Sequence, residues 1–235
     1  MIAQVQSSDA WTIASAVGTV IQAIAAVIVA AVAIWAYSTA RKQLEASKID
    51  RTVALIRLAS CEDMEFTFGF FDVSADLRAS RAACTALFNR LVQSRPIALR
   101  EVGEEVTQEA VQVAIDEMLN ELDNTIIDHP TEPTDRRREL AFRNKLFTLT
   151  NFCETAWVQA QTGSSDLDMF LADQDYNVAS SYYVLENVLQ YLVREEHFDF
   201  EDFRSIALAA QRHHCRRPNP SDAIAEARFR PLSDD

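Results

Sequence analysis

Residues 11–51 read WTIASAVGTVIQAIAAVIVAAVAIWAYSTARKQLEASKIDR, and this stretch decides how the chain is organised. Residues 13–35 contain no charged side chain, and Gln22 is their only strongly polar one. About 20 apolar residues, each rising about 1.5 Å, cross a hydrocarbon layer about 30 Å thick. The stretch therefore predicts a single transmembrane helix, which we place at residues 11–37.

Aromatic and basic residues flank this stretch, as is typical of membrane-interface anchors. The predicted anchors are Trp11, Trp35, Tyr37, Arg41 and Lys42. Lys48 and Arg51 add positive charge on the C-terminal side, whereas the N-terminal side has Asp9 and no Lys or Arg. The positive-inside rule then predicts a short extracytoplasmic segment at residues 1–10 and a cytoplasmic domain after the span.

A cleaved signal peptide is the competing interpretation, because residues 38–40 are small and resemble a cleavage site. A signal peptide has a basic segment before an apolar run of about 7 to 15 residues. The basic segment is absent and the run is longer. We therefore favour a membrane anchor.

Small residues recur one helical turn apart in the span, at Ala14, Gly18, Ala26 and Ala30. Such spacing lets two membrane helices approach closely, and Gln22 could hydrogen-bond to its counterpart on a second copy. The pattern predicts a homo-oligomer that is assembled through the spans. The alternative is that these pairs arise by chance in an alanine-rich helix.

Composition favours helices in the remainder of the 235 residues, because four glycines and six prolines are too few for an all-β fold. The formal net charge is -13 and basic residues are mostly scattered, which argues against nucleic acid as a partner. The four cysteines form no C-x-x-C pair, so they indicate buried thiols in a reducing compartment.

Apolar periodicity predicts an all-α chain in which the membrane helix continues into a multi-helix bundle. The predicted parts are a juxtamembrane helical extension at 38–60, a cytoplasmic helical domain at 61–216 and a disordered tail at 217–235. Within the domain we expect helices at 61–93 with a break near Gly69, at 104–128, at 134–163 and at 176–196, a short helix after Ser165, and a last helix after Asp199. Residues 131–134 are the predicted linker.

No motif in the sequence predicts a catalytic, cofactor-binding or metal site. Arg136, Arg137 and Arg138 begin a helix, where positive charge is unfavourable. They are a candidate patch for an acidic partner or a phosphorylated ligand; the alternative is that they pair with acids of a neighbouring helix.

Asn151 and Glu154 lie three residues apart on one helical face. We expect a buried hydrogen-bonded pair that fixes helix packing, with a ligand site as the alternative.

The order of several features resembles a bacterial family of single-span membrane proteins, the domain of unknown function 4760 type. The features are a span that ends in Trp and basic residues at 35–43, the segment Asn151 to Glu154, Gly and Asp at 163–168, an aromatic helix at 182–192, and the acidic-aromatic residues 198–203. Cys153 stands where an aromatic residue is common in the family. The resemblance implies a bacterial inner-membrane protein and brings no catalytic residues.

These observations predict a membrane-anchored interaction or signalling module that self-associates and binds an unknown cytoplasmic protein. One alternative is a single-span effector of phage defence or stress response that acts through assembly of its spans. Another is an enzyme with an unfamiliar site, for which Glu154, His197 and His214 are the first candidates.

Overall fold

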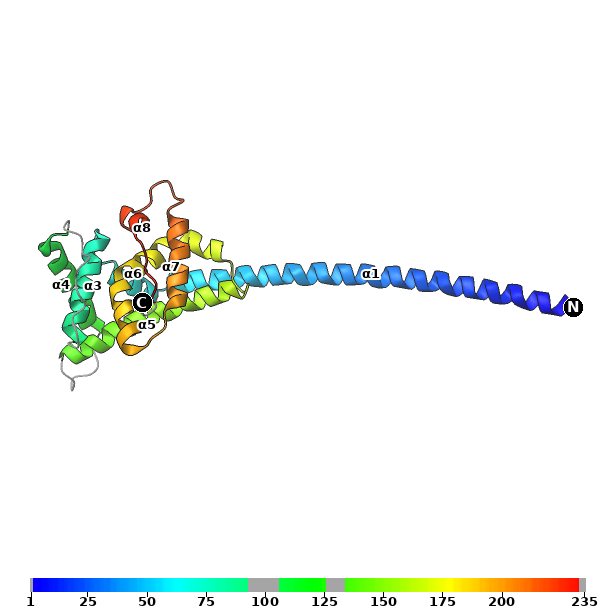
Figure 1. Ribbon diagram of the computed structural model, residues 1–235, viewed down its shortest axis with the longest axis horizontal. Helices are drawn as coiled ribbons and strands as arrows, with labels where there is room; N and C mark the ends of the chain where they lie inside the picture. Colours follow the sequence, from blue (N-terminus) through cyan, green and yellow to red (C-terminus); the bar gives the residue numbers. More distant parts are fainter. Residues whose placement is uncertain (1, 93–105, 126–133, 233–235) are drawn as a thin grey trace. The chain divides into compact units, whose positions relative to one another are not determined.

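The structure is a computed structural model that describes residues 2–92, 106–125 and 134–232; the side chains of residues 2–21, 23 and 25 lie outside this description. Across these ranges the chain forms α helices and no strand, which confirms the predicted all-α class. The helices, labelled in Figure 1, are α1 (Ile2–Ala59), α2 (Glu62–Phe71), α3 (Leu77–Val92), α4 (Gln108–Thr125), α5 (Thr134–Gln161), α6 (Leu167–Glu196), α7 (Glu201–His214) and α8 (Asp222–Glu226).

The chain divides into two compact units, Met1–Lys48 and Ile49–Asp235. The first unit lies entirely within α1 over its described residues. The second unit begins inside the same helix, where Thr52, Leu55 and Ala59 are buried. The Thr52 hydroxyl accepts a hydrogen bond of 2.7 Å from the Asp166 backbone N–H. The second unit therefore begins at Ile49, within the predicted juxtamembrane extension.

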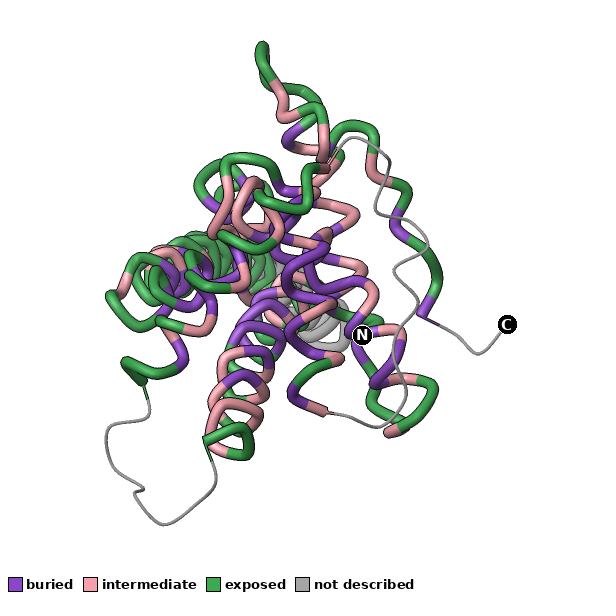
Figure 2. Tube along the Cα trace, turned by 90° about the vertical axis from the view of Figure 1, so that its left-hand side faces the viewer, coloured by how far each residue is buried: buried purple, intermediate pink, exposed green. Residues whose placement is uncertain are grey.

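Helix α6 is the centre of the second unit. Its buried side chains lie on all sides of the helix, so it needs neighbours all around. Helix α7 and helix α3 supply the largest of these contacts. Figure 2 shows the buried residues concentrated in the interior of the helical unit, with exposed residues on the outside.

Aromatic rings join α2, α3 and α5 on another side of the core. The Phe142 ring of α5 lies 5.9 Å from Phe70, 6.1 Å from Phe71 and 5.8 Å from Phe88, measured between ring centroids. The first two pairs are edge-to-face, a geometry that is favourable for aromatic rings. This cluster fixes α2 against the domain and leaves one face of α2 for solvent.

The predicted break near Gly69 is present and begins just after this glycine. Gly69 is inside α2, and the helix ends at Phe71. The new helix α3 begins after Asp76, whose carboxylate accepts a hydrogen bond of 2.9 Å from the Arg78 backbone N–H. A capping aspartate therefore sets the start of α3, as is typical of helix N-termini.

Gly163 ends α5 as predicted, with a positive φ of 69° that favours glycine. The expected short helix after Ser165 and the separate helix from Tyr176 are one helix, α6. The polar residues 173–175 gave a false boundary, because Asp175 is buried and paired inside the fold.

The tail at 217–235 was predicted to be disordered, and this is wrong for residues 217–232. Its apolar side chains Ile224, Phe229 and Leu232 are buried. The Gln211 side-chain amide donates to the backbone oxygens of Ile224 and Ala227 at 2.7 and 2.6 Å. The high content of Pro and charge in this segment hid three apolar side chains that are buried against the domain.

Parts of two predicted segments fall outside the described residues. The linker at 131–134 lies there except for Thr134, which begins α5. The predicted helix at 104–128 is described as α4 between Gln108 and Thr125.

We predict that the docked tail contributes to stability. The Phe229 ring packs 4.8 Å from the Tyr182 ring, between centroids. Phe229→Ala should lower the free energy of unfolding by about 3 kcal/mol because a buried ring is lost. The adjacent exposed Arg228→Ala should change it by less than about 0.5 kcal/mol. Urea unfolding of the full chain in an uncharged detergent measures both, and equal effects would contradict the docking.

Candidate functional site

The described part of the first unit exposes apolar side chains in every direction around α1. Val27, Ile28 and Val29 are consecutive, and each is more than half exposed. Consecutive helical residues point about 100° apart, so these three alone cover most of the circumference. The residues from Gln22 to Ala40 carry no charge. This part of the helix therefore has no polar face.

Within the described residues, no helix contains a stretch that is long and apolar enough to cross a membrane.

The predicted association and anchor residues are only partly described. The side chains of Trp11, Ala14 and Gly18 lie outside the described residues. Gln22, Ala26 and Ala30 are exposed and recur every four residues, so they share one face of α1. The anchors Trp35, Tyr37, Arg41 and Lys42 are exposed, and Arg41 Nε lies 3.2 Å from Glu45 Oε1.

The three arginines that begin α5 do not form a free basic patch. Arg138 makes two hydrogen bonds to the Asp123 carboxylate of α4, at 2.7 and 2.6 Å. These bonds raise the pKa of Arg138 and lower the pKa of Asp123. Arg136 pairs with Glu139 at 2.6 Å, and the Nε atom of Arg137 is buried without a partner. For Arg138 the geometry is that of the packing alternative, because its partner Asp123 belongs to the neighbouring helix α4.

Asn151 and Glu154 are not a buried pair, which corrects the expectation. Asn151 is exposed, whereas Glu154 is half-buried and its Oε1 atom has no hydrogen-bond partner. Burial, and then the negative charges of Asp202 and Asp199, raise the pKa of Glu154 to about 7. Glu154 is therefore a carboxyl group that changes its charge near neutral pH.

A buried polar cluster surrounds Asp175 of α6. Its Oδ2 atom accepts a hydrogen bond from His213 Nδ1 at 2.7 Å and forms an ion pair with Arg217, whose Nε atom lies 2.8 Å away. The His214 Nε2 atom accepts from the Ser221 backbone N–H at 2.9 Å, which places the proton of a neutral His214 on Nδ1, 3.6 Å from Asp175 Oδ1. The cluster ties the end of α7 and the start of the tail to α6.

The second buried carboxylate of α6, Glu186, joins α3 and the tail. Its Oε2 atom lies 2.8 Å from Arg81 Nη2 of α3, and its Oε1 atom accepts from the Arg230 backbone N–H at 2.7 Å. Arg81 also lies over the Tyr183 ring, 4.9 Å from its centroid. Like the Asp175 cluster, this arrangement is a structural junction between elements.

The candidate enzymatic residues do not gather in one site. Glu154 faces Asp202 in the first turn of α7, whereas His214 is the last residue of that helix, about 20 Å away along its axis. His197 is the left-handed C-cap of α6. Over the described ranges, no group of three or more His, Cys, Asp or Glu side chains is arranged to hold a metal ion.

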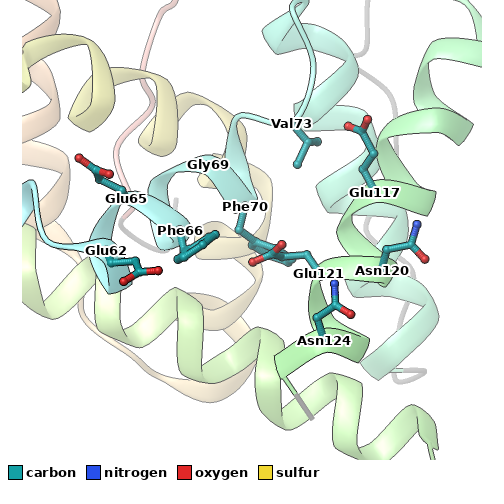
Figure 3. A pocket seen from close by; sticks show the side chains of 10 residues that line it. All are labelled: Glu62, Glu65, Phe66, Gly69, Phe70, Val73, Glu117, Asn120, Glu121 and Asn124. Carbon is teal, nitrogen blue, oxygen red and sulfur yellow. The ribbon is translucent and has the colours of Figure 1, made fainter. Parts of the chain in front are cut away.

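A hollow lies between α2 and α4, which we call the acidic groove (Figure 3). Its volume is about 720 Å³. It is lined by Glu62, Glu65, Phe66, Gly69, Phe70, Val73, Glu117, Asn120, Glu121 and Asn124. Figure 3 shows the α2 side chains on one side of the hollow and the α4 side chains on the other.

Sequence reasoning missed the acidic groove, although a signal for it exists. Residues 117, 120, 121 and 124 are polar at helical spacing, and residues 62, 65, 66 and 69 share one face of α2 in the same way. Each stripe alone is typical of a solvated helix face. Only the pairing of α2 with α4, which the sequence does not contain, brings the two stripes together.

Comparison of the chain with protein-family models, with curated protein sequences and with solved structures finds no match.

We predict a pH dependence of stability that originates at Glu154. Its pKa is raised from 4.5 to about 7, so the folded state keeps a proton that the unfolded state loses in this range. The stabilising contribution is fully present below pH 4.5 and is lost as the pH rises through about 7. Glu154→Gln should therefore gain stability relative to the parent as the pH rises from 5 to 8, roughly the span of the shift.

Urea unfolding at several pH values measures this difference. Asp202→Asn removes the neighbouring charge that has the larger effect on the pKa of Glu154, and should weaken the pH dependence while leaving Glu154 in place. A difference between parent and Glu154→Gln that is constant with pH would show that the pKa of Glu154 is not raised by burial or by the neighbouring charges.

Proposed function

We propose that the chain is a membrane-anchored helical interaction module. In this proposal its N-terminal helix lies in the inner membrane of a bacterium, with the N-terminus outside. The helix self-associates, and the acidic helical unit binds a cytoplasmic partner. The observation that carries the proposal is the helix surface between Gln22 and Ala40, which is uncharged and apolar on all sides.

Magnitudes favour an apolar environment for this helix. Seven large apolar side chains between Ile24 and Trp35 are more than half exposed. Burying such side chains stabilises by about 1.5–3 kcal/mol each, so their transfer out of water is worth on the order of 10 kcal/mol. That is comparable to the whole stability of a domain. A helix that is apolar all round needs such an environment, and a bilayer provides one.

The charges after the helix support the proposed orientation. Arg41, Lys42, Lys48 and Arg51 lie within about 16 residues of Trp35, in the region where basic residues determine the topology. Trp35 and Tyr37 immediately precede them, where amphipathic rings favour the headgroup level. The order of apolar, aromatic and basic residues is typical of a cytoplasmic membrane boundary.

The face that contains Gln22, Ala26 and Ala30 is the proposed self-association surface. Alanine side chains permit close approach of two helices, and a glutamine amide can donate and accept between copies. Ile28 points about 200° away from Ala26 around the helix, which places it on the opposite side. A specific interface would therefore bring Ala26, but not Ile28, close to its counterpart on a second copy, whereas random encounters would not distinguish the two positions.

Disulfide crosslinking in native membranes tests the anchor and the self-association together. Cys61 and Cys215, the thiols that are not buried, are first replaced by serine. We expect Ala26→Cys to crosslink several-fold more than Ile28→Cys under a mild oxidant, and Gln22→Leu to reduce the Ala26→Cys product. All variants should stay in the membrane fraction after carbonate extraction.

Two results would contradict the proposal in different ways. Release of the chain from the membrane by carbonate would show that the N-terminal helix is not a membrane anchor. Equal crosslinking at positions 26 and 28 would contradict the specific self-association surface and would leave the claim of a membrane anchor unaffected.

A further inference from the structure

Residues 227–232 lie along α7 as an extended peptide. They contain no helix, and their contacts with α7 move from Gln211 to Glu201 as the tail advances from Ala227 to Leu232, so the two segments run antiparallel. This part of α7 rises about 15 Å, a length that about five extended residues cover. The residues that this segment contacts form the tail-binding surface, which consists of Tyr182, Glu186, Glu201, Phe203, Arg204 and Gln211.

The polar side chains of the tail-binding surface bond to the backbone of the tail. Arg204 Nε donates to the Arg230 backbone oxygen at 2.6 Å, and Glu186 Oε1 accepts from the Arg230 backbone N–H at 2.7 Å. Gln211 and Glu201 bind further backbone groups of the tail in the same way. Hydrogen bonds to main-chain groups do not depend on the sequence of the bound segment, and proteins that recognise extended peptides use them for affinity.

Two side chains of the extended segment supply its apolar contacts. Phe229 and Leu232 are buried, whereas the side chains at positions 228, 230 and 231 are exposed. The Phe229 ring packs against Tyr182, whose ring in turn packs edge-to-face against Phe203. The surface therefore selects an aromatic and an aliphatic side chain that are three positions apart.

The charged groups of the tail-binding surface have partners besides the tail. Glu186 is paired with Arg81 of α3 at 2.8 Å, and Arg204 is paired with Glu201 at 3.5 Å. A buried charge is costly when it has no partner. Because these pairs do not involve the tail, the tail can leave the surface without creating an unpaired buried charge.

The tail is an imperfect occupant of this surface. Tyr182 is fully buried, and within the described part of the chain its hydroxyl group has no hydrogen-bond partner. Burial raises the pKa of Tyr182, and the charges of Glu186, Arg204 and Glu201 also act on it, so the hydroxyl lies near the groups that bind the tail backbone. A buried hydroxyl without a partner is unfavourable. A segment that offered it a hydrogen bond would therefore bind more tightly than the tail does.

We propose that the tail-binding surface is a peptide-binding site and that residues 227–232 occupy it as an internal inhibitor. The segment that replaces them belongs to the cytoplasmic partner and is extended. It carries an aromatic side chain with a hydrogen-bonding group in the place of Phe229, and an aliphatic side chain in the place of Leu232. The hydrogen-bonding group pairs with the Tyr182 hydroxyl. This inference rests on the proposed interaction module, because it specifies the partner that the module binds.

Fluorescence anisotropy of the full chain in an uncharged detergent tests the site, with a labelled peptide of residues 221–235 as the first probe. The chain's own tail competes with this peptide, so Phe229→Ala in the chain should tighten peptide binding by about tenfold or more. The same substitution in the peptide should abolish binding. Arg228→Ala in the chain changes an exposed side chain and should tighten binding by less than about twofold. Leu232→Ala loosens the tail independently if Phe229→Ala does not fold.

Peptides with Tyr, Trp or His in the place of Phe229 test the chemistry of the partner segment. At least one of them should bind the Phe229→Ala chain about fivefold more tightly than the tail peptide does, because it gains a hydrogen bond. Adding Tyr182→Phe to the chain should remove this gain without weakening the binding of the tail peptide itself, which makes no hydrogen bond to Tyr182.

Three results would overturn the proposal. The tail peptide could fail to bind every variant, Phe229→Ala and Leu232→Ala could both bind it no more tightly than the parent, or none of the polar aromatic peptides could gain affinity that depends on the Tyr182 hydroxyl. The peptide measurements need no membrane. Release of the chain by carbonate, together with peptide binding as expected, would therefore contradict the membrane anchor and leave the peptide-binding site standing.

Discussion

Two carboxylates buried in the central helix constrain the whole second unit. Asp175 and Glu186 are almost completely buried on α6, and a buried charge is costly unless it is paired and hydrogen-bonded. Asp175 obtains its partners from the end of α7 and from Arg217 at the start of the tail. Glu186 obtains its partners from Arg81 of α3 and from the backbone of the tail. The positions of α3, α7 and the tail around α6 follow from these requirements as well as from apolar packing.

The charged side chains of the second unit thus differ in whether they are paired inside the fold or lie on its surface. Asp175 and Glu186 of α6 are buried and paired with basic groups, although Asp175 Oδ1 accepts no hydrogen bond. At the start of α5, Arg136 and Arg138 pair with acids. Other carboxylates, on α2 and α4, instead line the acidic groove, where Lys145 pairs with Glu121. The negative charge of the second unit is therefore divided between carboxylates that hold the fold together and carboxylates that line the acidic groove.

Much of the helix content could be predicted from the sequence, because caps and apolar periodicity are local signals. Gly163 ends α5 and Asp199 accepts from the Glu201 backbone N–H beside the start of α7, as such signals suggest. The division of residues 164–196 was wrong because a buried Asp175 looks like a surface residue until its partners, 38 or more positions away, are known. The prediction of a disordered tail was wrong for a related reason, because Phe229 packs against Tyr182, which is remote in the sequence. The acidic groove needed the pairing of two helices, which no local pattern contains.

The central claim is that the uncharged part of α1 is surrounded by lipid. Spin labels introduced one at a time from Ile24 to Leu44, in liposomes and with Cys61 and Cys215 replaced, test it through their accessibility to a water-soluble nickel relaxation agent. The account predicts low accessibility at every position from Ile24 to Ile34, whichever face the residue occupies, and a rise between Tyr37 and Leu44 where the charged residues begin. High accessibility throughout residues 24–34, or an alternation of high and low values with the helical period, would contradict it.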